Sequence, residues 1–190
     1  MLKKITIATL MLFMLTGCIQ EDLSNRKITP KILKTATIAD VSSNFTFMYP
    51  KNLVSSKTEN RIELSESQQI SNNKLVIEEV TSSDEQFSLI TAIERTEEAS
   101  STQIKNMYPD ASDISVGYVT FNKIDSIVTK FRVDKKNGYF LEVVMITTNT
   151  KGKMMRITSI DTVNEKGNVI GTKHRFKDYA YLIASSIKLK

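Results

Sequence analysis

The sequence predicts an α+β domain: an antiparallel sheet of about six strands with helices packed on it. Three observations lead to this fold class. Short stretches that alternate apolar and polar residues recur along the chain, which is typical of half-buried strands. Asn137-Gly138 stands between two such stretches, and this dipeptide favours a hairpin between antiparallel strands. Two further stretches carry apolar residues at helical spacing, one in the middle of the chain and one at its C-terminal end.

The residues before the domain, 1–17, are organised like a secretory signal peptide. Lys3 and Lys4 precede the apolar run 5–15, which is too short for a membrane-spanning helix of roughly 20 residues. The run ends in Leu15-Thr16-Gly17-Cys18, which resembles the lipobox of bacterial lipoproteins. That resemblance implies cleavage before Cys18 and attachment of acyl chains to its thiol and new amine. An ordinary signal peptide followed by an unrelated cysteine is the alternative.

Cysteine usage agrees with lipid attachment. Cys18 is the only cysteine of the 190 residues, so the chain forms no intramolecular disulfide and no cysteine-based metal site. Two or three acyl chains on one residue hold a protein on a membrane, because each buried CH₂ contributes about 0.8 kcal/mol. The sequence therefore predicts a membrane partner reached through acyl chains on Cys18.

Residues 18–43 are expected to be the lipidated cysteine and a polar tether. They include Pro30 and show no clear period, although the part from Ile32 to Val41 is also compatible with a short strand or turn. Residues 44–190 are then expected to form a single globular domain, a length that needs no covalent staples.

The first half of the domain is expected to hold four strands. In the stretch 45–50, the aromatic residues Phe45, Phe47 and Tyr49 alternate with Thr46 and Met48, and Pro50 ends the strand. Residues 61–65 follow as a short second strand, and residues 74–80 as a third. The stretch 87–95 has apolar residues at both odd and even positions, which favours an interior strand covered on both faces.

A helix is expected next. Ser100 and Gln103 have the spacing of a capping box, Ile104, Met107 and Tyr108 make one apolar stripe, and the helix ends at Pro109.

The second half is expected to be an extended segment at 114–121 and then a three-strand meander. In the first of its strands, at 127–134, one face is apolar and the other carries Lys130, Arg132 and Asp134, which predicts a face in water. The second strand, 139–148, is apolar on both faces and should be central, and 153–160 completes the meander.

The chain is expected to close with a helix that lies across the sheet. Thr172 is the candidate N-cap, and Phe176, Tyr179 and Ile183 repeat at helical spacing. Lys188 and Lys190 are expected at its C-terminal end, where cations suit the helix dipole.

This layout, together with the Phe-Thr-Phe-Met-Tyr-Pro stretch at 45–50, resembles the PsbP/Mog1-like domains and the small bacterial lipoproteins related to DcrB. The resemblance spans residues 44–190 and includes Ser185-Ser186-Ile187 near the end. It implies a small α/β/α sandwich with an antiparallel sheet. It also implies a binding or assembly role, and it supplies no catalytic residues.

The sequence offers few residues for catalysis or metal binding. His174 is the only histidine, and it stands among Lys173, Arg175 and Lys177, a setting that disfavours a bound cation. No Gly-x-Ser-x-Gly nucleophile motif accompanies it, and no glycine-rich phosphate loop occurs. The prediction is therefore no enzyme, no catalytic residues, no metal and no cofactor. The formal net charge of +5 is spread along the chain, so a nucleic-acid partner is not expected.

The sequence thus predicts a non-catalytic lipoprotein of the cell envelope that acts as an assembly or accessory subunit for an envelope protein partner. The alternative is a periplasmic carrier or sensor of a small hydrophobic or anionic ligand, and the third is an envelope hydrolase. Ile19 and Gln20 after Cys18 include no aspartate of the kind that retains lipoproteins in the inner membrane. The outer membrane, facing the periplasm, is therefore expected, with the outer face of the cytoplasmic membrane as the alternative.

Overall fold

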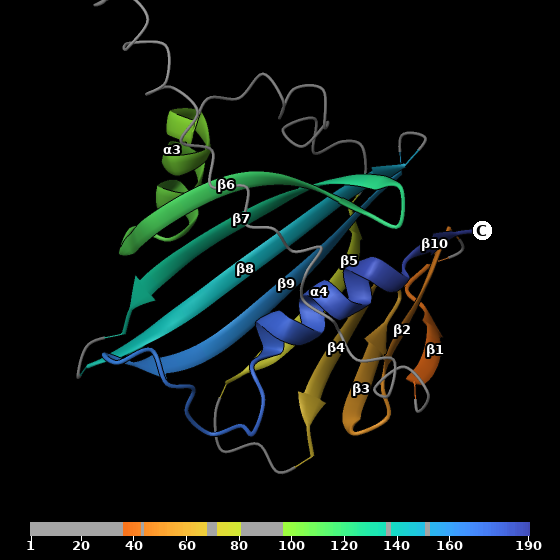
Figure 1. Cartoon of the computed structure of the whole chain (residues 1–190), viewed down its shortest axis with the longest axis horizontal. Coiled ribbons are helices and arrows are strands. Elements are labelled where there is room, and N and C mark those ends of the chain that lie inside the picture. Colours follow the sequence, from red (N-terminus) through yellow and green to blue (C-terminus); the bar gives the residue numbers. More distant parts are fainter. Residues whose placement is uncertain (1–35, 43, 68–71, 81–96, 136–137, 151–152) are drawn as a thin grey trace, which may run out of the picture.

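The computed structural model describes residues 36–42, 44–67, 72–80, 97–135, 138–150 and 153–190. These residues form a large sheet, a small sheet and two helices (Figure 1). The α+β class and the antiparallel sheet predicted from the sequence are confirmed, because every strand pair is antiparallel.

The large sheet has seven strands. Their order across the sheet is β3 (Leu53–Thr58), β4 (Arg61–Glu66), β5 (Lys74–Val80), β9 (Lys153–Asn164), β8 (Tyr139–Thr150), β7 (Ile124–Asp134) and β6 (Ala111–Phe121). The predicted meander is confirmed as β7-β8-β9, and β6 extends it by one strand at the edge. β9 lies at the centre, next to β5, which pairs with it over seven residues.

The small sheet contains both ends of the described chain. β2 (Phe45–Pro50) lies between β1 (Ala36–Asp40) and the two-residue strand β10 (Lys188–Leu189). It stands beside α4 (Phe176–Ser186), as Figure 1 shows. Phe45 and Phe47 of β2 are buried in the same core cluster as the apolar side chains of α4.

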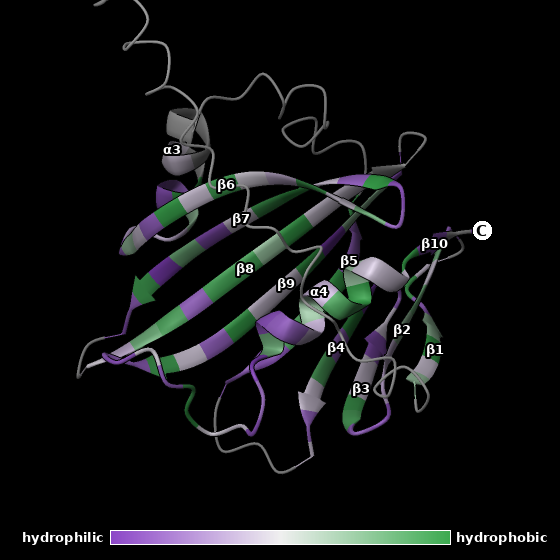
Figure 2. Ribbon diagram, viewed as in Figure 1, coloured by the Kyte–Doolittle hydropathy of each residue, from purple (hydrophilic) through white to green (hydrophobic). Residues whose placement is uncertain are grey.

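The two faces of the large sheet carry separate cores. On β8, Val144 and Ile146 belong to the cluster that contains α4 and the small sheet. Val143 and Met145, which point the other way, belong to a second cluster with Ile104 of α3 (Glu97–Met107). Figure 2 shows hydrophobic bands on neighbouring strands of the large sheet. The sheet is thus covered on both faces, with α4 lying across it as predicted.

The prediction of about six strands agrees with the seven strands of the large sheet, but it was wrong in one placement. Phe45–Pro50 belongs to the separate small sheet. β3 was missed because only its first residue, Leu53, is buried, so its sequence has no alternating pattern. The strand predicted at 87–95 lies outside the described residues.

The element ends also differ from the prediction. β1 lies in the part of the expected tether, Ile32 to Val41, for which a short strand was also considered, so the folded part begins no later than Ala36. α3 begins at Glu97, which places Ser100 inside the helix rather than at its cap. α4 ends at Ser186. Lys188 therefore does not extend the helix but lies in β10, where it pairs with Thr46 of β2. Within the described part of the chain, no helix has the length and apolarity needed to cross a membrane.

Candidate functional site

The N-terminus of α4 is held by a carboxylate from the sheet. Asp161 Oδ1 accepts a hydrogen bond from Phe176 N at 2.7 Å, and Oδ2 accepts one from Lys177 N at 2.9 Å. The residue at the N-cap position, Arg175, makes no side-chain cap hydrogen bond. The predicted N-cap, Thr172, is therefore wrong: its hydroxyl donates to the carbonyl of His174. Asp161 of β9 takes the place of a local N-cap residue because the first turn of α4 packs directly on the sheet.

Asp161 is fully buried, and a second carboxylate stands opposite it. Glu142 of β8 is its register partner across the two strands. Burial raises the pKa of Asp161, while its two backbone hydrogen bonds and the charges of Lys177 and Arg175 act in the opposite direction. Like charges directly opposite on a sheet are unfavourable. The pair is stabilised here by the positive pole of α4 and the basic residues at its start.

Glu142 is surrounded by three cations. Arg132 Nη2 of β7 lies 3.3 Å from Oε1, and Arg175 Nη1 lies 3.3 Å from Oε2. Lys177 Nζ of α4 is 3.9 Å from the same Oε2. Charge-assisted hydrogen bonds usually measure about 2.7–2.9 Å, so all three contacts are long. One carboxylate therefore partners three cations, and none of them closely.

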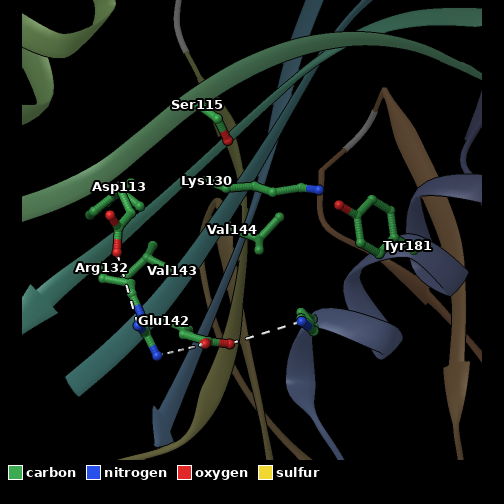
Figure 3. A pocket seen from close by; sticks show the side chains of 10 residues that line it. Asp113, Ser115, Lys130, Arg132, Glu142, Val143, Val144 and Tyr181 are labelled. Atoms are coloured by element: carbon green, nitrogen blue, oxygen red, sulfur yellow. Dashed lines mark hydrogen bonds and ion pairs between the residues drawn. The ribbon is translucent and has the colours of Figure 1, made fainter. Parts of the chain in front are cut away.

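A pocket of about 250 Å³ lies beside this cluster, between β6, β7, β8 and the start of α4 (Figure 3). We call it the β7–α4 pocket. Figure 3 shows the side chain of Lys130 extended toward the Tyr181 ring, with Val144 on the floor between Lys130 and Glu142. Its lining residues are Asp113, Ser115, Lys130, Phe131, Arg132, Glu142, Val143, Val144, Lys177 and Tyr181. The pocket is lined by charged and apolar groups together.

A β-bulge brings the second carboxylate of the pocket into place. The β6–β7 register shifts between Ser112 and Ser115, and Asp113 has a φ of 52°. Bulges re-aim side chains. Here Asp113 Oδ2 comes within 3.9 Å of Arg132 Nη1, although the Asp113 side chain is 69% exposed. The guanidinium of Arg132 also lies 5.0 Å from the centre of the Phe140 ring.

The opposite face of the sheet offers a contrast. There Arg156 donates from Nε and Nη2 to Glu78 Oε1, at 2.8 and 2.6 Å. The two residues are register partners on β9 and β5. This pair has the close geometry expected of a structural ion pair. The cations around Glu142 do not have it.

The structure does not gather the sequence candidates into a catalytic set. His174 is exposed, and its ring lies 5.9 Å from the ring of Tyr179. Within the described residues no three histidine, cysteine or acidic side chains come close enough to hold a metal ion. Cys18 lies outside the described residues. The sequence did indicate the basic start of α4 and the charged face of β7 with Lys130 and Arg132. Nothing in the sequence showed that the two meet at one pocket.

Comparison with known proteins supports the fold and gives no function. No family model and no curated protein matches the chain. It is similar to the solution structure of cyanobacterial PsbP from Synechocystis sp. PCC 6803, with 12% identity, a TM-score of 0.55, and coverage of 82% of this chain and 93% of that one. A crystal structure from Bacteroides thetaiotaomicron is similar over 82% of this chain, with 12% identity and a TM-score of 0.48. The chain spans 48% of the length of that protein. The similarity to cyanobacterial PsbP confirms the PsbP-like fold expected from the sequence.

Proposed function

We propose that this chain is a lipoprotein of the bacterial cell envelope that acts by binding, as an assembly or accessory subunit for an envelope protein. The observation that carries this proposal is the distance along the chain between the lipobox and the fold. Cys18 precedes the first described strand, which begins at Ala36, by a short polar stretch. At about 3.3–3.6 Å per residue, that stretch reaches at most ~60 Å. A partner would thus be met close to the membrane.

Binding also accounts for the chemistry of the domain. The exposed His174 faces the Tyr179 ring, and burial raises the pKa of Tyr179. A general base takes a proton from substrate or water, and the contact of the His174 ring with the Tyr179 ring gives no positive support for that role. An envelope hydrolase is therefore not proposed. The membrane is proposed to be the outer one, with the domain in the periplasm.

A second candidate function is the carriage or sensing of a small anionic ligand. The β7–α4 pocket favours it, because basic side chains from β7 and from α4 face one small cavity. The two functions are compatible, since a ligand in this pocket would touch α4 and the sheet together.

Partner binding is tested by crosslinking in cells and affinity purification from envelopes solubilised in detergent. The wild-type chain is compared with a chain whose residues 1–18 are replaced by the signal peptide of a non-lipidated exported protein. An envelope protein captured reproducibly with both forms supports the assembly role. Capture of no envelope protein by either form contradicts it.

Lipid attachment has its own prediction. Cys18→Ala is expected to abolish incorporation of radiolabelled palmitate, because no other thiol is present in the chain. The signal-replaced chain is expected to leave the membrane fraction, since the loss of two or more acyl chains removes about 0.8 kcal/mol for each buried CH₂. Ser24→Ala is the control and should keep both label and membrane. Palmitate labelling of Cys18→Ala, or membrane retention of the signal-replaced chain, would contradict the prediction.

A further inference from the structure

We propose that the β7–α4 pocket binds a small anion that carries a phosphate or carboxylate group, and that Glu142 is the internal group with which this anion competes. The inference deepens the second candidate function, and it does not depend on lipid attachment or on a protein partner.

The first argument is charge. Four basic side chains face the pocket or its carboxylate: Lys130, Arg132, Arg175 and Lys177. Facing them are Glu142, the exposed Asp113 and the buried Asp161. Both oxygens of Asp161 are already used by the backbone N–H groups of α4. Asp161 therefore offsets the partial positive charge of the helix N-terminus more than it offsets the charges of the basic side chains. The pocket keeps an excess of positive charge, which favours an anion.

The second argument is the geometry of the existing contacts. Arg132 and Arg175 approach Glu142 no closer than 3.3 Å, whereas Arg156 reaches Glu78 at 2.6 Å in the same protein. The guanidinium of Arg132 also has a buried Nε without a hydrogen-bond partner among the described residues. A buried N–H donor without an acceptor is uncommon in folded proteins, so this Nε–H is expected to find an acceptor when a ligand is bound. An added oxyanion would supply one, because the guanidinium fork matches phosphate and carboxylate.

The third argument is size and access. The cavity of about 250 Å³ is smaller than the roughly 300–1,000 Å³ typical of pockets for drug-sized ligands. The side chains of Arg132, Lys177 and Arg175 are 29%, 28% and 32% exposed, so an anion from solvent can reach them. Val144 and the Tyr181 ring bound the cavity with apolar surface. These features suit an inorganic oxyanion or a short organic acid.

The competition gives the proposal a distinctive test. Glu142→Gln removes the competing negative charge and leaves the cations in place. Affinity for the anion is therefore expected to rise about tenfold, the effect of one charge at close range. Glu78→Gln removes a carboxylate from the opposite face of the same sheet. It is the matched control, because it changes the net charge equally without touching the pocket.

The experiment is calorimetric titration of the full chain, in a non-ionic detergent, with inorganic phosphate in one arm and succinate in the other. Ionic strength is held constant with chloride. The proposal expects binding in at least one arm, tighter binding by Glu142→Gln, and wild-type affinity in Glu78→Gln. No binding of either anion by the wild type and Glu142→Gln overturns it. An equal gain in both variants also overturns it, since the effect is then one of net charge only.

A second pair of variants keeps the test decisive if Glu142→Gln does not fold. Lys130→Gln removes a cation that lines the pocket, and Lys153→Gln removes an exposed one at the start of β9. Binding is expected to weaken about tenfold in Lys130→Gln, the loss of one charge-assisted contact, and to stay unchanged in Lys153→Gln. Equal affinities for the two variants would overturn the proposal.

Discussion

Replacing Asp161 by alanine is expected to lower the free energy of unfolding by about 2–4 kcal/mol, the combined effect of losing a helix cap and leaving buried N–H groups without acceptors. Asp161 accepts from both Phe176 N and Lys177 N, and its side chain is fully buried. No other acceptor for Phe176 N is recorded among the described residues, and α4 supplies much of the core between the two sheets. Urea unfolding followed by circular dichroism measures the loss.

Asp161→Asn is the informative comparison. It keeps one carbonyl oxygen for the helix N-terminus and removes the charge, so it should cost about 1 kcal/mol, the value of one hydrogen bond. A loss as large as that of the alanine variant would show that the negative charge, and not the hydrogen bonds, holds α4.

The difference in stability between the wild type and Asp161→Asn is also expected to depend on pH. Burial raises the pKa of Asp161 above its ordinary value of 3.8. An acid whose pKa is raised in the folded state contributes stability that is present below its unfolded pKa and is lost as the pH rises through the folded one. The stability advantage of the wild type over Asp161→Asn should therefore be largest below pH 3.8 and should shrink as the pH rises above it. An advantage that grows with pH would mean that the helix terminus outweighs burial.

The second large effect is expected at the aromatic strand. Phe47→Ala should destabilise the protein by about 3–5 kcal/mol, as is typical when a buried phenylalanine is truncated. Phe47 is 1% exposed, belongs to the main core cluster and lies 6.1 Å from the Tyr49 ring, measured between ring centres.

Its matched control is Ile38→Ala, in the neighbouring strand β1. Ile38 is 71% exposed, so its truncation should change the stability by no more than about 0.5 kcal/mol. Denaturant midpoints measured in parallel decide the comparison. Similar losses in the two variants would mean that the small sheet is held by strand propensity and not by burial of its aromatic face.

The elements that sequence analysis identified are those whose pattern reflects burial. β7 and β9 each bury an alternating set of side chains, β8 buries side chains on both faces, and these patterns are visible before any contact is known. β3 and β10 lack this signal. β3 buries one residue, and β10 is a two-residue strand that exists because β2 presents a free edge to the end of the chain.

The candidate site was predictable only in parts. The basic start of α4 and the charged face of β7 were both evident from the sequence. The charged face of β7 was expected to face water. In the structure Lys130 and Arg132 instead face the start of α4. Two features had no sequence signal. The capping of α4 by Asp161 depends on how the helix crosses β9, and the bulge that carries Asp113 toward Arg132 depends on strand pairing.

The arrangement of the small sheet has a consequence for the order of folding. Phe45 at the start of the domain pairs with Leu189, next to the last residue of the chain, and Lys74 of β5 pairs with Ile160 of the central strand. Contacts of such long sequence separation form slowly, because the intervening chain must first be closed into a loop. A chain that emerges N-terminus first would expose β2 long before β10 is available as its second neighbour. Its main core would therefore close only after residues 188–189 had emerged.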